Sequence, residues 1–201
     1  MTSPTPSSSA TGSQAWLFFR QWLKNPLAIA ALAPSGTQLA GRMTAELPHG
    51  TKRVIELGAG TGVFTRAMLD SGIAAEQLLV VELNEELHGH LRAQFPTAHV
   101  VCGNACDLSS IVRDENFAGA GEVDAVVSGL GLLSMSRDLQ RSIMRSAFEV
   151  LGPGGSFIQF TYSPMPPLSR EVLDELGLTV RRGGFAWRNL PPATVFVFSR
   201  R

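Results

Sequence analysis

The stretch of sequence that decides the fold is Val54-Ile55-Glu56-Leu57-Gly58-Ala59-Gly60-Thr61-Gly62-Val63-Phe64-Thr65. It begins as a short apolar strand, passes through three glycines spaced two apart, and resumes in a pattern typical of a helix. A strand that runs through glycines into a helix N-terminus lets the backbone approach a bound cofactor where a side chain would collide. A tight turn without a ligand is the alternative interpretation of the same glycines.

The spacing of the glycines separates this loop from two other nucleotide-binding loops. A dinucleotide fingerprint reads G-x-G-x-x-G, whereas the third glycine here comes one position early, at Gly62. A phosphate-binding loop ends in Gly-Lys-Ser/Thr, and this stretch has no lysine. The pattern Glu-x-Gly-x-Gly-x-Gly resembles motif I of the class I S-adenosylmethionine-dependent methyltransferases, in which the loop lies under the methionine end of the cofactor. The resemblance implies cofactor contacts from Glu56, Gly58, Ala59, Gly60, Thr61 and Gly62.

Two further strands are followed by residues suited to the nucleoside part of such a cofactor. Residues 78–81 form a continuous apolar run, as expected of a strand buried on both faces of a parallel sheet. Glu82 follows it, where an acid can accept hydrogen bonds from both ribose hydroxyls; capping of the next helix is the alternative. After a third strand at 99–102, Asn104 or Asp107 could contact adenine, and Asn104 fits the motif position better; an Asx turn is the alternative. The predicted nucleoside contacts are Glu82, Leu83, Asn104 and Ala105.

Length and composition limit the class of protein. With 201 residues, 44% of them hydrophobic, the chain is long enough to bury one good core, so one domain is expected. The 17 basic and 17 acidic residues give a formal net charge of zero, and no global field favours nucleic acid as a partner. Both ends are nevertheless locally basic, because residues 1–45 and the segment after Glu175 contain cations and no acid.

Cys102, Cys106 and His99 are the residues that suggest a metal site. No fourth ligand with suitable spacing follows them, so we predict no metal and interpret the cysteines as reduced thiols. The sequence shows no secretory signal, and no apolar run approaches the roughly 20 residues that a membrane span needs.

The first 50 residues divide into two segments. Residues 1–13 are mostly Ser, Thr, Pro, Ala and Gly and predict a disordered leader. Residues 14–50 predict helices, and residues 15–24 place large aromatic side chains on one helix face and cations opposite. This pattern is typical of a helix in a membrane interface, with packing on the domain as the alternative. The membrane contacts predicted are Trp16, Phe19, Arg20, Trp22 and Lys24.

Strands and helices alternate along the predicted core, residues 51–201. The pattern predicts helices at 64–70, 85–94 and 170–176, a polar loop at 114–121, and strands at 123–127, 156–162, 179–182 and 193–198. Such alternation indicates a doubly wound α/β sheet, whose ligands lie at the carboxyl ends of the strands. A row of arginines at 137, 141 and 145 indicates a solvated helix face, with a phosphate contact as the alternative.

Several short segments, in this order, resemble the bacterial phospholipid N-methyltransferases over about residues 15 to 200. They are Pro34-Ser35, 56–62, Glu82-Leu83-Asn84, Gly103-Asn104-Ala105, Ser128-Gly129-Leu130, Gln159-Phe160-Thr161-Tyr162 and Asn189-Leu190-Pro191-Pro192-Ala193. The resemblance implies the Rossmann-like class I methyltransferase fold, a seven-stranded sheet with its last strand antiparallel, preceded by an N-terminal helical extension. It adds Ser35, Ser128, Gly129 and Leu130 to the cofactor contacts. Gly131 departs from the proline usual in that family and predicts a looser loop.

This resemblance implies methylation of phosphatidylethanolamine, and of its mono- and dimethyl forms, toward phosphatidylcholine, with S-adenosyl-L-methionine as methyl donor. Tyr162 is predicted to orient the lipid amine or accept its proton, beside Ser128. Arg188 and Asn189 are predicted to bind the substrate, Arg188 through the lipid phosphate. The expected location is cytoplasmic, peripheral on the inner face of the cytoplasmic membrane, with an anionic membrane surface as partner and no nucleic acid.

Other functions fit parts of the same pattern. The rRNA adenine dimethyltransferases are related, but they carry Asn-x-Pro-Pro/aromatic after the fourth strand to hold and stack on an adenine. Residues 128–131 contain neither asparagine, proline nor an aromatic residue, and no basic C-terminal domain follows to hold RNA. Small-molecule methylation and a non-catalytic nucleoside-binding module are the remaining alternatives.

Overall fold

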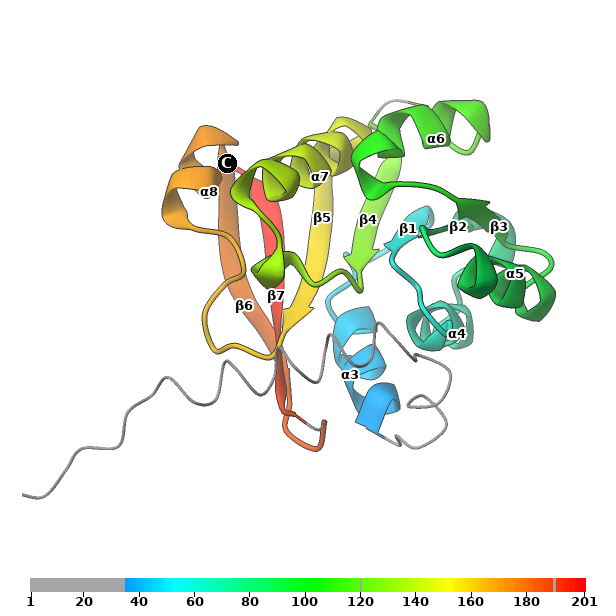
Figure 1. Cartoon of the computed structure of the whole chain (residues 1–201), viewed down its shortest axis with the longest axis horizontal. Helices are drawn as coiled ribbons and strands as arrows, with labels where there is room; N and C mark the ends of the chain where they lie inside the picture. Colours follow the sequence, from blue (N-terminus) through cyan, green and yellow to red (C-terminus); the bar gives the residue numbers. More distant parts are fainter. Residues whose placement is uncertain (1–34, 120, 190) are drawn as a thin grey trace, which may run out of the picture.

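The computed structural model describes residues 35–119, 121–189 and 191–201, which are coloured in Figure 1. The predicted membrane-interface helix, with Trp16 and Trp22, lies outside these ranges. Within them, no helix combines the length and the hydropathy that a bilayer-spanning segment needs.

The described residues form one seven-stranded sheet, as predicted. Its strands are β1 Val54–Leu57, β2 Leu78–Glu82, β3 His99–Cys102, β4 Val123–Ser128, β5 Leu151–Thr161, β6 Leu178–Ala186 and β7 Ala193–Arg200. The order across the sheet is β3-β2-β1-β4-β5-β7-β6. The pairs among β1 to β5 are all parallel, while β7 runs antiparallel to both β5 and β6. The prediction of a doubly wound sheet with an antiparallel last strand is therefore confirmed.

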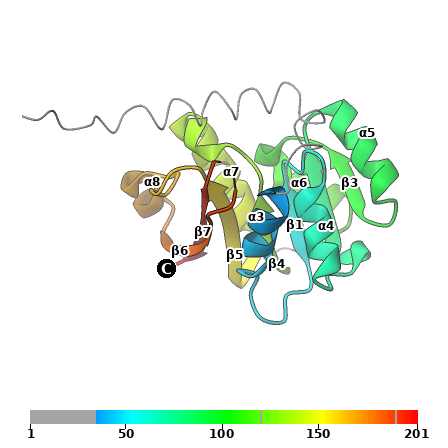
Figure 2. The ribbon, with the colours of Figure 1, turned by 90° about the horizontal axis from the view of Figure 1, so that it is seen from below.

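Helices cover both faces of the sheet (Figures 1 and 2). The helices are α3 Ser35–Thr44, α4 Val63–Asp70, α5 Glu85–Gln94, α6 Leu108–Asp114, α7 Arg137–Val150 and α8 Arg170–Glu175. Apolar side chains of α3, α4 and α5 pack on one face, and those of α6, α7 and α8 pack on the other. Because both faces are covered, every residue of β1 and β2 is buried, which explains their continuous apolar runs.

The order of β1 and β4 in the sheet creates the switch point. The chain moves outward from β1 through β2 to β3, and then returns to place β4 on the other side of β1. Connections therefore leave β1 and β4 on opposite faces, and in open α/β sheets the ligand binds outside the carboxyl ends of the strands at such a point. The glycine stretch follows β1. Ser128 is the last residue of β4, and residues 129–130 come directly after it, so the fold brings both predicted loops to the carboxyl ends of β1 and β4.

Three elements differ from the sequence-based expectations. Helix α6 was not predicted, and Asp114, expected to begin a loop, is its last residue. Strand β5 begins at Leu151, five residues earlier than predicted. Its register with β4 shifts between the pairs Val123↔Leu151 and Ala125↔Ser156, so the glycines between Leu151 and Ser156 form an irregularity within the strand. Strand β6 extends to Ala186 and crosses a register shift at the Gly183-Gly184 pair. The prediction interpreted residues 151–155 as a turn and ended the later strand at Arg182, but tertiary pairing continues each strand on both sides of its glycines.

The arginine row on α7 is a solvated face, as the first interpretation proposed. Arg137 pairs with Glu171 at 2.7 Å, and Arg141 and Arg145 both pair with Glu175 at 2.7 Å. These ion pairs join α7 to α8 and leave no unpaired arginine among the three for a phosphate.

Candidate active site at the carboxyl ends of β1, β4 and β5

The glycine loop has the backbone that the sequence predicted. Gly58, Gly60 and Gly62 all have positive φ angles, of 68°, 58° and 80°. This left-handed region favours glycine, which explains three glycines two residues apart. Gly62 is also the N-cap of α4, so the loop passes directly into the helix N-terminus.

The loop after β1 touches the loop after β4. A Cβ atom on Gly58 would lie 2.7 Å from Leu130 Cδ2, and one on Gly129 would lie 2.5 Å from the Gly58 carbonyl oxygen. Gly129 N–H also donates to the Leu57 carbonyl at 2.8 Å. The two loops therefore fit together only because glycine occupies both positions.

Glu56 is a fully buried carboxyl group beneath the glycine loop. Its Oε2 accepts a hydrogen bond of 2.5 Å from the Thr65 hydroxyl on α4, while its Oε1 has no partner among the described residues. Burial raises the pKa of Glu56 to about 8, opposed by the hydrogen bonds from Thr65 and reinforced by the charge of Glu82. An acid that lacks one partner is suited to meet a cation or an N–H donor that arrives with a ligand.

Glu82 fixes the glycine loop from the end of β2. Its Oε2 accepts from Gly60 N–H and its Oε1 accepts from Asn84 N–H, both at 2.9 Å. Asn84, rather than Glu82, caps α5 by accepting from Leu87 N–H at 3.0 Å. The helix-cap alternative for Glu82 is therefore wrong, and the carboxylate lies at the strand end that the ribose interpretation requires.

The residues expected near an adenine follow β2 and β3. Leu83 is 68% exposed. Asn104 is exposed, and its Oδ1 accepts from Cys106 N–H at 3.0 Å, which is the Asx turn of the alternative interpretation. Ala105 is half-buried against the core. The Asx turn and the proposed adenine contact are compatible, because the turn uses only the amide oxygen.

The loop after β4 is held by two buried glutamines that the sequence reasoning did not select. Gln159 on β5 donates from Nε2 to the Leu130 carbonyl at 2.8 Å, and Gln140 on α7 donates to the Leu132 carbonyl at 2.7 Å. Ser134 closes the loop further, since its hydroxyl donates to the Gly131 carbonyl at 2.6 Å. Hydrogen bonds thus hold the loop in place although Gly131 replaces the proline that the resemblance would imply.

Ser128 is fully buried at the end of β4 and pairs in register with Gln159. Its hydroxyl oxygen accepts from Leu130 N–H at 3.3 Å, so it shapes the same loop from within. Like Glu56 Oε1, Gln159 Oε1 is buried and has no hydrogen-bond partner among the described residues. A glutamine inside an otherwise apolar strand was the signal in the sequence that would have identified Gln159.

Tyr162 and Asn189, both predicted to bind substrate, are brought together. Burial of the phenol raises the pKa of Tyr162, and the neighbouring Asn189 side chain opposes this shift. Asn189 is buried and donates to the Pro191 carbonyl at 2.8 Å. A row of edge-to-face rings joins Tyr162 to the glycine-loop helix, with centroid distances of 5.5 Å from Tyr162 to Phe160 and 5.7 Å from Phe160 to Phe64.

Helix α3 and the turn between β6 and β7 border this end of the site. Arg188 N–H donates to Gln38 Oε1 on α3 at 2.9 Å, and the Arg188 guanidinium lies over the Trp187 ring. At the start of α3, Gly36 lies against Val63, the first residue of α4. Ser35 is the first residue of α3, and its side chain is outside the described part of the structure. The helix therefore begins beside the glycine loop, where the sequence predicted a cofactor contact.

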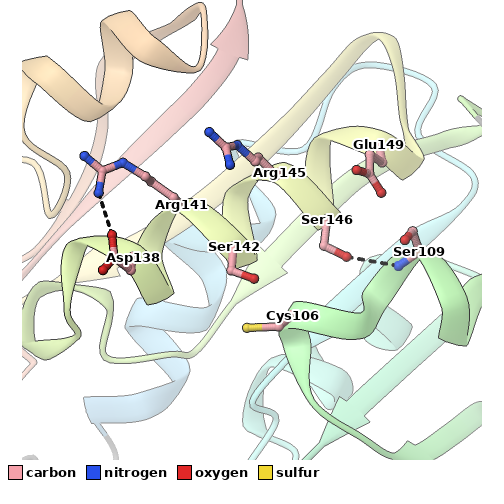
Figure 3. A pocket seen from close by; sticks show the side chains of 8 residues that line it. All are labelled: Cys106, Ser109, Asp138, Arg141, Ser142, Arg145, Ser146 and Glu149. Atoms are coloured by element: carbon pink, nitrogen blue, oxygen red, sulfur yellow. Dashed lines mark hydrogen bonds and ion pairs between the residues drawn. The ribbon is translucent and has the colours of Figure 1, made fainter.

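A hollow lies on the other helical layer, between α7 and the start of α6, and its volume is about 380 Å³. Figure 3 shows the side chains that line it. Its lining residues are Cys106, Ser109, Asp138, Arg141, Ser142, Arg145, Ser146 and Glu149. The two arginines are already engaged by Glu175, so the hollow has no free cation for an anionic ligand. Across the described residues, no group of three His, Cys, Asp or Glu side chains is placed to hold a metal ion.

Comparison with known protein sequences gives two matches. A family described as "Methyltransferase domain" matches residues 54–155. An ornithine lipid N-methyltransferase of Singulisphaera acidiphila is 34% identical over 187 residues, which cover 90% of this chain and 93% of that protein.

Solved structures share the fold at low sequence identity. The 1,6-didemethyltoxoflavin-N1-methyltransferase of Burkholderia thailandensis, solved with S-adenosylhomocysteine, has a TM-score of 0.65 at 14% identity, over 100% of this chain and 94% of that one. A TehB-like S-adenosylmethionine-dependent methyltransferase of Corynebacterium glutamicum has a TM-score of 0.59 at 18% identity, over 94% of this chain and 100% of that one.

Proposed function

Because the chain belongs to the methyltransferase-domain family and is an S-adenosylmethionine-dependent N-methyltransferase, we propose that its acceptor is the head-group amine of a membrane lipid. The observation that carries this proposal is the 34% identity to an enzyme that methylates ornithine lipid, which extends over nearly the whole length of both chains. Local motifs alone would not require such end-to-end similarity.

Phosphatidylethanolamine and its mono- and dimethyl forms are the proposed acceptors, converted toward phosphatidylcholine. The support is the set of motifs after β4, at β5 and before β7, including Ser128-Gly129-Leu130 and Asn189 to Ala193. Ornithine lipid is the second candidate, favoured by the relative's own substrate. Both head groups present an amine close to an anionic group, so Arg188 at the rim of the site suits either one.

The residues around the glycine loop fit S-adenosylmethionine. We propose that Glu56 Oε1, which is buried without a partner among the described residues, accepts a hydrogen bond from the cofactor's amino group. Because Gly58 and Gly129 have no side chains, we propose that the methionine part of the cofactor lies against their backbone. Glu82 is proposed to accept from the ribose hydroxyls while it holds Gly60, and Leu83 with Asn104 and Ala105 to flank the adenine. Ala59, Thr61 and Gly62 complete the proposed loop contacts, and Ser35 the contact from α3.

The proposed reaction is an in-line displacement. When bound, S-adenosylmethionine supplies an electrophilic methyl group: the amine lone pair forms the N–C bond while the C–S bond breaks and its electrons stay on sulfur. Ser128, Gly129 and Leu130 shape the opening through which the amine approaches. The alkyl amine has a pKa near 10 in water, and the apolar surroundings lower it so that the neutral form is available. Since burial raises the pKa of Tyr162, we propose that its phenol stays protonated and orients the amine.

The N-terminal segment is the proposed link between this site and the membrane. We propose that the segment with Trp16, Phe19, Arg20, Trp22 and Lys24 lies in the interface of an anionic membrane, with the aromatic face toward the acyl chains. The enzyme would then work peripherally on the inner face of the cytoplasmic membrane, and lipid would reach the site without leaving the bilayer.

The test is methyl transfer from labelled S-adenosylmethionine to detergent-dispersed phosphatidylethanolamine, ornithine lipid and an rRNA fragment. Label in a lipid, separated by thin-layer chromatography to identify the head group and count the methyls, supports the proposal. Gly58→Arg should abolish transfer, because a side chain there meets Leu130, whereas Gly154→Arg is the matched control since nothing lies within 4 Å of Gly154. Label in RNA, or in neither lipid while the cofactor still binds, would overturn the lipid assignment and leave the enzyme class intact.

A further inference from the structure

The turn between β6 and β7 exposes two aromatic side chains. Phe185 is 44% exposed and Trp187 is 60% exposed, whereas Ala186 between them is fully buried. Phe185 lies near the end of β6, and Trp187 lies two residues further on, in the turn that follows the strand. Together they form an apolar surface at the end of the hairpin.

An arginine guanidinium lies close to each of these two rings. The Arg182 guanidinium lies 5.8 Å from the Phe185 ring centroid, and the Arg188 guanidinium lies 4.7 Å from the Trp187 ring centroid. Arg42 on α3 adds a third cation, because its side chain touches Gly184. We define these five residues, Arg42, Arg182, Phe185, Trp187 and Arg188, as the hairpin patch.

The charges of the hairpin patch are not neutralised within the described residues. None of its arginines forms an ion pair there, in contrast to Arg181 next to it, which pairs with Glu46 at 2.7 Å. Residues 176–201 include five arginines and no acidic residue. Exposed aromatic rings next to unpaired arginines are complementary to a surface of apolar chains and phosphates.

The hairpin patch borders the proposed acceptor site. In the sheet, Phe185 pairs with Thr194, and Thr194 pairs with Thr161 at the end of β5, one residue before Tyr162. Asn189, two residues after Trp187, contacts the Tyr162 hydroxyl. Figure 1 shows the β6–β7 turn at the same end of the molecule as the arrowheads of β4 and β5. A surface that bound here would meet the opening of the site.

We propose that the hairpin patch is a membrane-docking surface for an anionic phospholipid bilayer, separate from the N-terminal segment. Trp187 and Phe185 enter the interface, and the arginines contact lipid phosphates. Docking presents the opening beside Tyr162 to the head groups. The proposal deepens the proposed function and rests on it for the substrate, but vesicle binding itself requires no methyl transfer.

The experiment uses the full-length chain and sedimentation with vesicles of phosphatidylethanolamine and phosphatidylglycerol, compared with vesicles of phosphatidylcholine alone. To remove the contribution of the N-terminal segment, a background variant carries Trp16→Ser and Trp22→Ser. On that background, Phe185→Ser with Trp187→Ser is expected to weaken binding to the anionic vesicles at least about tenfold. Arg182→Gln should weaken it about fivefold, and less at high salt, because the attraction of one cation is screened.

The matched control is Leu139→Ser with Arg113→Gln, which removes one exposed apolar side chain and one exposed cation from α7 and α6. It should bind vesicles like its background. Every variant should bind S-adenosylmethionine normally and methylate detergent-dispersed lipid at the unchanged rate, which shows that the fold and the site are intact.

Unchanged vesicle binding of the Phe185/Trp187 double variant would overturn the docking surface, even if lipid is methylated. Loss of binding to an rRNA fragment, with vesicle binding unchanged, would assign the patch to nucleic acid instead and also overturn it. Loss of vesicle binding in an enzyme that methylates no lipid in detergent would support the docking surface and reject the lipid substrate. The two proposals therefore fail separately.

Discussion

Glu56 is the residue whose ionisation should be visible in the stability of the protein. Its pKa is about 8 in the folded protein and 4.5 in the unfolded chain, because burial disfavours the carboxylate. Between these pH values the folded protein binds a proton that the unfolded chain has lost, so this group makes stability fall as pH rises. Below about pH 4.5 both states are protonated and the stability from this group is complete.

The first prediction is that Glu56→Gln removes this slope. Without ligand, the variant should gain stability relative to the parent as pH rises from 5 to 8, by up to about 1.4 kcal/mol per pH unit, measured by urea unfolding. The same variant should bind S-adenosylmethionine about ten- to a hundredfold more weakly by calorimetry, because a hydrogen bond between charged partners is lost. A parallel pH dependence in parent and variant would contradict the raised pKa.

Tyr162 is the residue at which orientation and proton transfer can be separated. The second prediction is that Tyr162→Phe lowers kcat/KM for the lipid about tenfold or more while leaving cofactor affinity unchanged, because the ring stays on Phe160 and only the hydroxyl is lost. Since the pKa of the phenol is raised above its usual value of 10, the rate–pH profile below pH 10 should keep the same ascending limb in the variant. An ascending limb that disappears would mean that Tyr162 accepts the proton.

At the scale of elements, the loop after β4 depends on hydrogen bonds donated by buried glutamines. The third prediction compares Gln159→Leu with Gln140→Leu. Each change removes a side-chain hydrogen bond to a loop carbonyl that keeps one backbone donor, and should lower the free energy of unfolding by about 0.5–1.5 kcal/mol. Only Gln159→Leu should also lower methyl transfer strongly, since Gln159 holds Leu130 beside Gly58. Equal losses of activity in the two variants, measured at matched stability, would reject a specific role for Gln159.

Gly131 lies in the same loop, at a place where the backbone does not require glycine. Its φ is −79° and its ψ is 55°, and Leu132 N–H donates across it to the Leu130 carbonyl at 2.9 Å. This inverse γ-turn suits proline, whose ring fixes φ near −65°. The fourth prediction is that Gly131→Pro raises the free energy of unfolding by about 0.4–1 kcal/mol through the unfolded chain. A marked loss in chemical denaturation would mean that the glycine is needed.

At the scale of the whole molecule, cofactor binding should stabilise both halves of the sheet together. The site is built from loops after β1, β2, β3 and β4, so a ligand that binds only the folded chain connects them. The fifth prediction is a rise in Tm of about 5–10 °C at a hundredfold excess of S-adenosylmethionine over Kd, equivalent to about 2.7 kcal/mol. Gly58→Arg should show no rise, whereas Gly154→Arg should behave like the parent.

Most of the helices and strands could be predicted from the sequence because the patterns that indicate them lie within short segments of the chain. Apolar runs marked β1, β2 and β4, and Asn84 marked the start of α5 at Glu85. Helix α6 escaped prediction since its seven residues carry only a short apolar pattern, which becomes a helix by packing Leu108 and Val112 into the core. The prediction placed a turn at the glycines of β5 and stopped β6 before its glycine pair, because no local pattern shows that a neighbouring strand resumes pairing beyond them.

The sequence by itself determined the glycine loop, the acid at the end of β2 and the alternation of strands and helices, because each depends on residues close together in the chain. Only the tertiary structure decided which oxygens of Glu56 and Gln159 lack partners, that Tyr162 meets Asn189, and that Phe185 and Trp187 stay exposed beside unpaired arginines. These properties depend on which residues, distant in the chain, pack against one another. Packing determines burial and charge pairing, and no local sequence pattern does.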